Sequence, residues 1–256
     1  MILVILHNIL WAFLFLSWGS FLNVVAYRLL HGVPFFGARS RCPHCNHTIA
    51  WYDLVPVVSW FWLRGKCRTC KKAISPLYPI IELSTLVSFW LLTTSVPSQF
   101  WLAYGLLFSA LIVTVRTDIE EMIILRWCTL LILPFGLLFS SMGLLPISLG
   151  QAFLGAGLGF GMLWLTDRIY YAATKHHGIG DGDPELLATI GAFIGPFGCW
   201  VTLLLGSLLG SLVGITFFVR HGRAARTIKL PFGPFLAAGA MLFIFLEKYL
   251  NSIFGL

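Results

Sequence analysis

Long apolar runs separated by short polar connections make up most of the chain. Eight runs are recognisable, and all but the sixth are long enough for a helix to cross a bilayer. The predicted spans are residues 4–27, 78–97, 99–117, 122–143, 148–172, 184–197, 200–219 and 232–250. Because the backbone must satisfy its own hydrogen bonds in lipid, we predict an all-α polytopic membrane protein with about eight transmembrane helices. The short sixth run predicts a broken or partial helix, and no internal repeat is visible.

Composition and charge narrow the class. The 256 residues are 58% hydrophobic and 11% charged, whereas a soluble domain carries about 25% charged residues. The net charge of +7 indicates basic cytoplasmic loops in a membrane protein rather than nucleic-acid binding. The first run lacks a basic region before it and is too long for the apolar core of a signal peptide, so we expect a retained helix.

The basic residues also predict an orientation. Sixteen of the 17 Lys and Arg residues fall on one side of the eight-span arrangement, mostly in the loop at 28–78 and the loop before the last span. Only Lys248 falls on the other side. The positive-inside rule therefore places the 28–78 loop in the cytoplasm and both termini outside.

The 28–78 loop contains two CxxC pairs that are separated by 21 residues. Two such knuckles supply the four thiolates of a tetrahedral structural zinc site, and the reducing cytoplasm argues against disulfides. We predict Zn²⁺ bound by Cys42, Cys45, Cys67 and Cys70; two redox pairs or free thiols are the alternative. The aromatic residues between the pairs either pack around the metal or rest on the membrane surface, and Asp53 among them is expected to be a solvated loop acid.

These features divide the chain into three predicted domains. Residues 1–27 form the first transmembrane helix, and residues 28–78 form a small cytoplasmic cysteine-rich zinc-binding domain. Residues 79–256 form a membrane core with about seven transmembrane helices. His44 and His47 are possible substitute metal ligands.

Two clusters of acids lie at the ends of predicted spans, on the cytoplasmic side of the predicted arrangement. They comprise Asp118, Glu120 and Glu121 after the third span, and Asp181, Asp183 and Glu185 in a glycine-rich turn at the sixth. Ionisable groups at this depth are functional by default. Two carboxylates held close together share a proton, so that one activates water and the other protonates the substrate, as in aspartyl proteases.

A structural explanation of the same acids is also open. Asp183 stands before Pro184, which suits a helix N-cap, whereas the dipole at the end of the third span would disfavour an anion at Asp118. The glycines of the turn would let a substrate backbone approach and let the turn adopt unusual dihedral angles. Asp167 looks peripheral, and His176 and His177 look interfacial and solvated.

Four motifs, in order along the chain, resemble those of the type IV prepilin peptidases. They are "GSFLNVVAYRL" at 19–29, the cysteine region at 40–82, "GIGDGD" at 178–183 and "LPFGPFLA" at 230–237. The resemblance implies that Asp118 and Asp183 are catalytic, that the four cysteines bind zinc, and that Gly178, Gly180 and Gly182 support the catalytic turn. Glu82 in "YPIIE" is a candidate cofactor-binding residue; a helix N-terminal acid is the alternative.

The implied function is that of a GxGD-type aspartyl endopeptidase in the bacterial inner membrane. It would remove the basic leader of type IV prepilins or pseudopilins at the cytoplasmic face. It would then methylate the new N-terminal Phe with S-adenosylmethionine. The implied partners are these substrates and the lipid bilayer, with no nucleic acid; the sequence does not predict an oligomeric state.

Three departures from the family pattern keep alternatives open. Glu185 replaces a Lys, Leu125-Arg126 replaces a Pro-Asp sequence after Leu, and Leu54 replaces an Asn. Arg126 could return the positive charge that is lost at Glu185. One alternative is an inactive or weakly active, zinc-stabilised scaffold paralogue. Another is an acid-relay transporter, which would favour acids at mid-bilayer and paired repeats.

Overall fold

The structure is a computed structural model that describes residues 2–34, 39–222 and 230–254. Apart from two isolated β-bridges, the secondary structure of these residues is helical, which confirms the all-α prediction. The chain divides into two compact units, Met1–Thr94 and Ser95–Leu256. Three of the basic residues behind the predicted orientation, Arg223, Arg226 and Lys229, lie outside the described residues.

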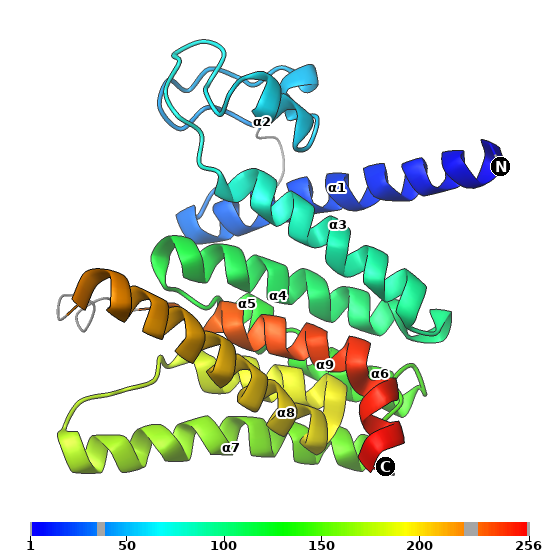
Figure 1. Ribbon diagram of the computed structural model, residues 1–256, viewed down its shortest axis with the longest axis vertical. Coiled ribbons are helices and arrows are strands. Elements are labelled where there is room, and N and C mark those ends of the chain that lie inside the picture. The colour runs from blue at the N-terminus through cyan, green and yellow to red at the C-terminus, as the bar shows by residue number, and fades with distance from the viewer. Residues whose placement is uncertain (1, 35–38, 223–229, 255–256) are drawn as a thin grey trace. The chain divides into compact units, whose positions relative to one another are not determined.

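Within the described ranges, five helices are long and apolar enough to cross a membrane. These are α1 (Ile2–His31), α3 (Leu77–Ser95), α4 (Trp101–Glu121), α7 (Leu149–Thr174) and α8 (Gly182–His221). The other elements are η1 (Trp51–Leu54), α2 (Val58–Trp62), η2 (Ser98–Phe100), α5 (Arg126–Thr129), α6 (Leu133–Ser141) and α9 (Gly233–Phe254). Each predicted apolar run has a helical counterpart, while the number of complete membrane passes stays a prediction (Figure 1).

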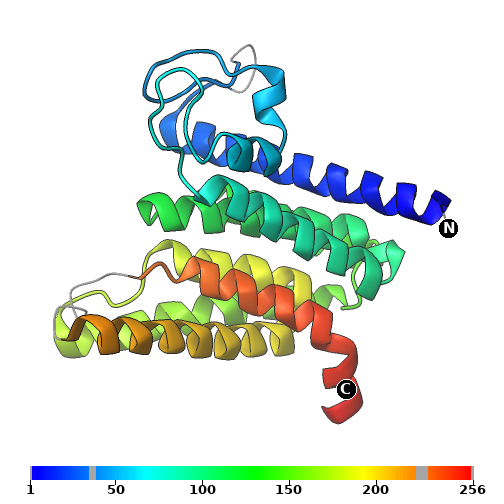
Figure 2. The same cartoon turned by 45° about the horizontal axis from the view of Figure 1, so that its top comes forward.

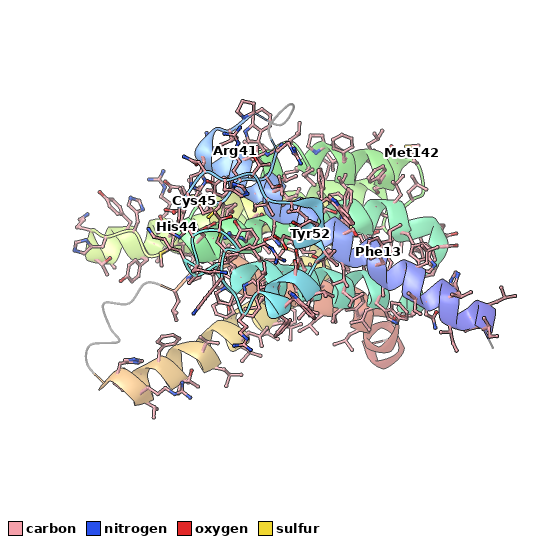
Figure 3. All side chains as sticks on the ribbon, turned by 90° about the horizontal axis from the view of Figure 1, so that it is seen from above. Phe13, Arg41, His44, Cys45, Tyr52 and Met142 are labelled. Carbon is pink, nitrogen blue, oxygen red and sulfur yellow. The ribbon has the colours of Figure 1, made fainter. Side chains whose placement is uncertain are left out.

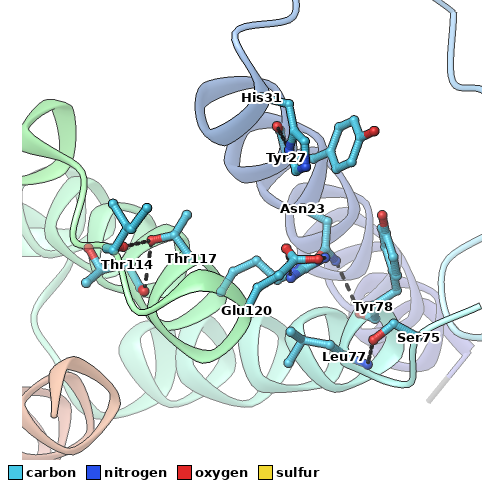
Figure 4. Close-up of polar contacts among 11 residues, drawn as sticks. Asn23, Tyr27, His31, Ser75, Leu77, Tyr78, Thr114, Thr117 and Glu120 are labelled. Atoms are coloured by element: carbon cyan, nitrogen blue, oxygen red, sulfur yellow. Dashed lines mark hydrogen bonds and ion pairs between the residues drawn. The ribbon is translucent and has the colours of Figure 1, made fainter. Parts of the chain in front are cut away.

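In the first unit, α1 and α3 pack closely through the "GSFLN" motif. A Cβ atom on Gly19 would lie 2.9 Å from both Glu82 Cα and Thr85 Oγ1, so only glycine allows this approach. One turn further on, Asn23 Nδ2 donates a hydrogen bond to the Tyr78 carbonyl at 3.2 Å (Figure 4). The motif therefore fixes the start of α3 against α1, and it does so with backbone contact and a buried amide.

In the second unit, α8 consists of two helical arms joined by a sharp bend. Gly195 at the bend has φ 74° and ψ −177°, which a residue with a Cβ atom adopts only with strain, and Pro196 cannot donate a backbone hydrogen bond. The arm at 182–194 runs along α7, and the arm at 196–221 runs back beside α9 (Figures 1 and 2). This bend accounts for the short sixth run and the separate seventh run of the sequence.

Glycine contacts define both of these helix pairs. In the first pair, a Cβ atom on Gly155 of α7 would lie 2.2 Å from the Gly191 carbonyl oxygen. In the second pair, a Cβ atom on Gly198 would lie 2.6 Å from the Phe243 ring, and one on Gly206 would lie 3.1 Å from the Phe235 carbonyl oxygen. The contacts of Gly198 with Phe243 and of Gly206 with Phe235 show that α9 runs antiparallel to the returning arm of α8.

The predicted fourth span, 122–143, is the least accurate part of the fold prediction. Helix α4 continues through Glu121, and Met122 then adopts the left-handed conformation and donates to the Asp118 carbonyl at 3.0 Å. The span itself is divided into α5 and α6, with Pro134 at the start of α6. Residues before a proline are disfavoured in helical conformation, and an apolar run contains no hydropathy signal for such a break.

Candidate functional site

Two of the six clustered acids are buried, and four are not. Asp118 and Asp183 are only 5% and 6% exposed. Glu120, Glu121 and Asp181 are exposed, and Glu185 is intermediate. Carboxylates are rarely buried without a compensating partner, so these two positions need a physical explanation.

Asp118 lies in the last turn of α4 and is stabilised by the beginning of α9. The backbone N–H of Gly233 donates to Asp118 Oδ2 at 2.9 Å, across 115 residues of sequence. Gly233 is the first residue of α9, where backbone N–H groups lack helical partners and the helix dipole favours an anion. The dipole of α4 disfavours an anion at this end, so the support for Asp118 comes from the beginning of another helix.

Asp183 lies in the first turn of α8 and reaches back toward the turn before it. Its Oδ2 accepts a hydrogen bond from the Gly180 backbone N–H at 3.1 Å. The N-cap position belongs to Asp181 and shows no side-chain cap, so the N-cap explanation of Asp183 is wrong. Among the described residues, Asp183 Oδ1 is buried without a hydrogen-bond partner.

Both carboxylates lie at the same end of the second unit, around the side chain of Ile124. A Cβ atom on Gly182 would lie 2.6 Å from Ile124 Cβ, and one on Gly233 would lie 3.5 Å from Ile124 Cδ1. Asp183 directly follows Gly182, and Asp118 accepts the hydrogen bond from Gly233. Their charges are close enough to interact electrostatically.

The three glycines of the turn are required for space rather than for unusual dihedral angles. Gly178, Gly180 and Gly182 are not among the described residues with positive φ, contrary to the expectation from sequence. Instead, a Cβ atom would lie 2.9 Å from the Tyr170 ring at Gly178 and 3.0 Å from Asp183 Oδ2 at Gly180. A side chain on this turn would therefore displace the groups that position Asp183.

Asp167 organises this turn, although it looked peripheral in the sequence. Its Oδ1 accepts hydrogen bonds from the backbone N–H groups of Gly178 and Ile179 at 3.0 and 3.2 Å. Its Oδ2 lies 2.7 Å from His177 Nδ1, and the His177 ring stacks on Tyr171. The spacing of ten residues across a loop has no sequence signature, which is why this contact was missed.

Two of the departures from the family pattern contact each other. Arg126 Nε lies 3.5 Å from Glu185 Oε1, and Thr129 Oγ1 donates to Glu185 Oε2 at 3.3 Å. Arg126 therefore returns a positive charge to the position where the family has a lysine. Since the Arg126 side chain is 76% exposed, the pair is partly screened by solvent.

In the first unit, the four cysteines form one cluster. Their sulfur atoms all lie within 4.8 Å of one another, and the Cys42 and Cys70 sulfurs are 3.8 Å apart. A tetrahedral zinc ion with bonds of about 2.3 Å to sulfur would hold neighbouring sulfurs about 3.8 Å apart. A backbone hydrogen bond from Cys70 lowers the pKa of Cys67 to about 7, which favours the thiolate that a metal binds. The cluster therefore fits structural zinc.

The two knuckles are structural copies of each other, which the sequence analysis missed. Cys42 and Cys67 each bond to the backbone of a residue four positions later and of one five positions later, at 2.9–3.0 Å. Asn46 and Lys71 occupy equivalent left-handed positions with φ of 54° and 60°. The sequence signal is faint, because only the cysteines, a preceding basic residue and a following Ile match. In Figure 3, Arg41, His44 and Cys45 of the first knuckle lie together.

Two acids near this cluster are held by specific partners. Asp53 forms a two-pronged ion pair with Arg68, with distances of 2.6 and 2.9 Å, and this pairing lowers the pKa of Asp53. The expectation of a solvated loop acid is therefore wrong. Glu82 is 6% exposed, and its Oε2 accepts a hydrogen bond from the Val57 N–H at 2.7 Å. Val57 has φ 62°, an uncommon conformation for a β-branched residue, and Glu82 stabilises it.

Comparison with known proteins agrees with the motifs. Residues 13–96 match the Bacterial Peptidase A24 N-terminal domain, and residues 105–215 match the Type IV leader peptidase family. A prepilin leader peptidase/N-methyltransferase from Aeromonas hydrophila is 37% identical, covering 93% of this chain and 92% of its own. The protein of that name from Stutzerimonas stutzeri is 34% identical, covering 86% of this chain and 83% of its own.

A more distant relative has a different name. The type 4 prepilin-like proteins leader peptide-processing enzyme from Escherichia coli O78:H11 is 32% identical over 90% of each chain. No solved structure matches the chain significantly. The matched regions contain both buried acids, the glycine turn and all four clustered cysteines. The chain therefore belongs to the type IV leader peptidase family.

Proposed function

We propose that this protein is a membrane aspartyl endopeptidase that removes the leader of type IV prepilins or pseudopilins, with Asp118 and Asp183 as its catalytic pair. The observation that carries the proposal is the selective burial of these two acids at one end of the second unit. The names of the relatives supply the substrate class. The orientation predicted from basic residues puts this end at the cytoplasmic face of the inner membrane.

The hydrogen bonds support a paired mechanism. Each carboxylate has one oxygen held by a backbone N–H, from Gly233 or from Gly180. The unpartnered Asp183 Oδ1 is costly to bury unless a reacting water or substrate group hydrogen bonds to it. In the proposed reaction the pair shares one proton. The ionised carboxylate takes a proton from water, whose oxygen attacks the scissile carbonyl carbon, while the protonated carboxyl donates its proton to the carbonyl oxygen. As the C–N bond of the tetrahedral intermediate breaks, the first carboxyl gives the proton from water to the leaving amine, and a hydroxyl of the intermediate returns a proton to the second carboxylate.

The exposed acids around this pair suit the proposed substrate. A prepilin leader is basic, and the mature protein begins with an apolar helix that lies in lipid. Glu121 and Asp181 are exposed beside the buried pair and would attract the basic leader, whereas Glu120 is already paired with Arg116.

Zinc and S-adenosylmethionine have different support. The cysteine cluster fits zinc, which would be structural because four protein ligands leave no open position. Methylation of the new N-terminus by S-adenosylmethionine is proposed from the names of the relatives. Glu82 does not fit a cofactor-binding role in the described geometry, since it is buried and one of its oxygens is bonded to Val57. No step of methyl transfer is therefore assigned to it.

A cleavage assay in membranes with a prepilin-like substrate tests the proposal. It compares the wild type with Asp118→Asn, Asp183→Asn and the matched control Asp181→Asn, whose side chain is exposed in the same turn. Loss of acid–base catalysis lowers rates by about 10²- to 10⁴-fold, so the first two variants should be inactive in a standard assay. The control should cut normally.

Each other outcome has a distinct meaning. Inactivity of Asp181→Asn with activity in Asp183→Asn would show that the wrong acid of the turn has been chosen. A wild type that cuts no prepilin or pseudopilin would favour the scaffold alternative.

A further inference from the structure

The short helix α2 turns an apolar face away from the protein. Val58, Phe61 and Trp62 are 60%, 62% and 80% exposed, and their spacing places them on one side of a helix. The helix is held by Trp60 on its other side, where Nε1 donates to the Ile74 carbonyl at 3.2 Å and the ring packs against Gly65. The exposed face is therefore a fixed surface of the cysteine region.

Residues of η1 extend this surface. Trp51 and Tyr52 are 78% and 51% exposed. Tyr52, Val58 and Trp62 line one depression of about 270 Å³, together with Val55, Ser59 and the Asp53–Arg68 ion pair. The aromatic face is defined as Trp51, Tyr52, Val58, Phe61 and Trp62. A group of exposed aromatic side chains of this kind marks an interaction site with a protein, a ligand or a membrane.

The position of α2 relative to α3 indicates which of these it is. Val57, immediately before α2, donates its N–H to Glu82, which lies in the second turn of the apolar helix α3. The aromatic face therefore begins beside the first turns of a candidate membrane span. Ile80 and Leu83 on that part of α3 are 54% and 41% exposed, so this part of α3 also presents apolar side chains.

Charge at the end of α2 points the same way. Arg64 and Lys66 follow the helix directly and are both exposed. Tryptophan and tyrosine prefer the boundary between acyl chains and headgroups, and nearby basic residues are attracted by anionic lipid. A soluble partner or a second copy of the chain would not require the face to lie at this depth.

We propose that the aromatic face docks the cysteine region onto the membrane itself. Phe61 and Trp62 lie at the boundary between headgroups and acyl chains, and Arg64 and Lys66 contact the phosphates of anionic lipids. Glu82 and Val57 set the depth of this contact. The zinc-binding knuckles are thereby held on the bilayer beside α3, independently of whether the second unit is catalytically active.

Photo-crosslinking of the full-length protein tests the docking. Benzoylphenylalanine replaces Phe61 or Trp62 in separate variants, reconstituted in nanodiscs of phosphatidylcholine with or without phosphatidylglycerol. His44 is the matched control position, because it is exposed on the first knuckle (Figure 3). We expect lipid adducts at 61 and 62, several-fold fewer at 44, and a higher yield with the anionic lipid.

Other products would overturn the proposal. Adducts only to protein, whether a second copy or an added prepilin, would assign the face to that partner. Loss of lipid adducts on adding S-adenosylmethionine would assign the depression to the cofactor. Equal lipid labelling at position 44 would show that lipid contact is not specific to the face. Since the readout is an adduct mass, it is separate from the cleavage assay that tests the proposed function.

Discussion

The hydrogen bond between Gly233 and Asp118 allows a sharp test of how the site is positioned. In Gly233→Ala, the new Cβ atom would lie 2.8 Å from Asp118 Oδ2, whereas ordinary contacts begin at 3.4 Å. The carboxylate must therefore retreat by about 0.6 Å or the start of α9 must move. Either change weakens a hydrogen bond that measures 2.9 Å in the wild type.

The expected loss follows from two independent magnitudes. A hydrogen bond to a charged group contributes about 1.5–3 kcal/mol, and about 1.4 kcal/mol corresponds to a tenfold change in rate, which together predict a loss of about 10- to 100-fold. Misplacement of a catalytic group by about 1 Å costs up to about 100-fold, which agrees with this range. We therefore expect Gly233→Ala to cut a prepilin-like substrate about 10- to 100-fold more slowly than the wild type.

Initial rates of cleavage in membranes, normalised to enzyme content, measure this loss. Gly161→Ala in α7 is the matched control, because it makes the same chemical change where a Cβ atom meets no neighbour within 4 Å. The control should cut normally and, since alanine favours helices over glycine by about 0.5–1 kcal/mol, it should unfold at the same or a higher temperature in detergent. Thermal unfolding of Gly233→Ala separates a displaced carboxylate from a general loss of structure.

One result would refute the reasoning directly. If Gly233→Ala is well folded and cuts within about twofold of the wild type, then the Gly233 hydrogen bond does not position a catalytic group. The assignment of Asp118 would then lose its structural support.

Three further predictions concern the surroundings of the site and the metal cluster. Arg126→Gln should keep cleavage within about fivefold of the wild type, because an exposed ion pair with Glu185 contributes about 1 kcal/mol or less; a loss above tenfold would contradict this. Asp167→Ala should lower kcat, because it removes the acceptor of two backbone N–H groups. Asp167→Asn keeps an acceptor oxygen and should restore part of the rate. Equal rates in both variants would argue against a positioning role. Cys70→Ser should reduce bound zinc, measured by elemental analysis, and make the cysteine region sensitive to protease, while His44→Ala should do neither.

The apolar runs were sufficient to predict the fold class but not every helix end. Hydropathy reports transfer into lipid, and a break inside an apolar segment does not change it. The division of 122–143 into α5 and α6 therefore could not be predicted from hydropathy. The bend in α8 was predictable in part, because Gly195-Pro196 interrupts an otherwise continuous apolar stretch.

The site was predictable where the chemistry is local in sequence. Each CxxC pair places two sulfur atoms close together through its short spacing, so the cluster of four sulfur atoms was predictable. The contacts of Gly233 and Asp167 depend on which helix ends meet, so they were not predictable from spacing. The same is true of Asp53, whose partner Arg68 lies 15 residues away in the second knuckle.

The bend in α8 also explains how Asp118 meets an N–H group from near the end of the chain. A straight helix of 40 residues would be about 60 Å long, twice the roughly 30 Å thickness of the hydrocarbon core. The bend at Gly195 returns the chain to the end from which it started, so that α9 begins beside Asp118 and Asp183. Without it, Gly233 would start α9 at the opposite end, and Asp118 would be buried without a donor. The Gly195-Pro196 pair is therefore a requirement of the proposed active site, although it lies at the far end of the arm that begins with Asp183.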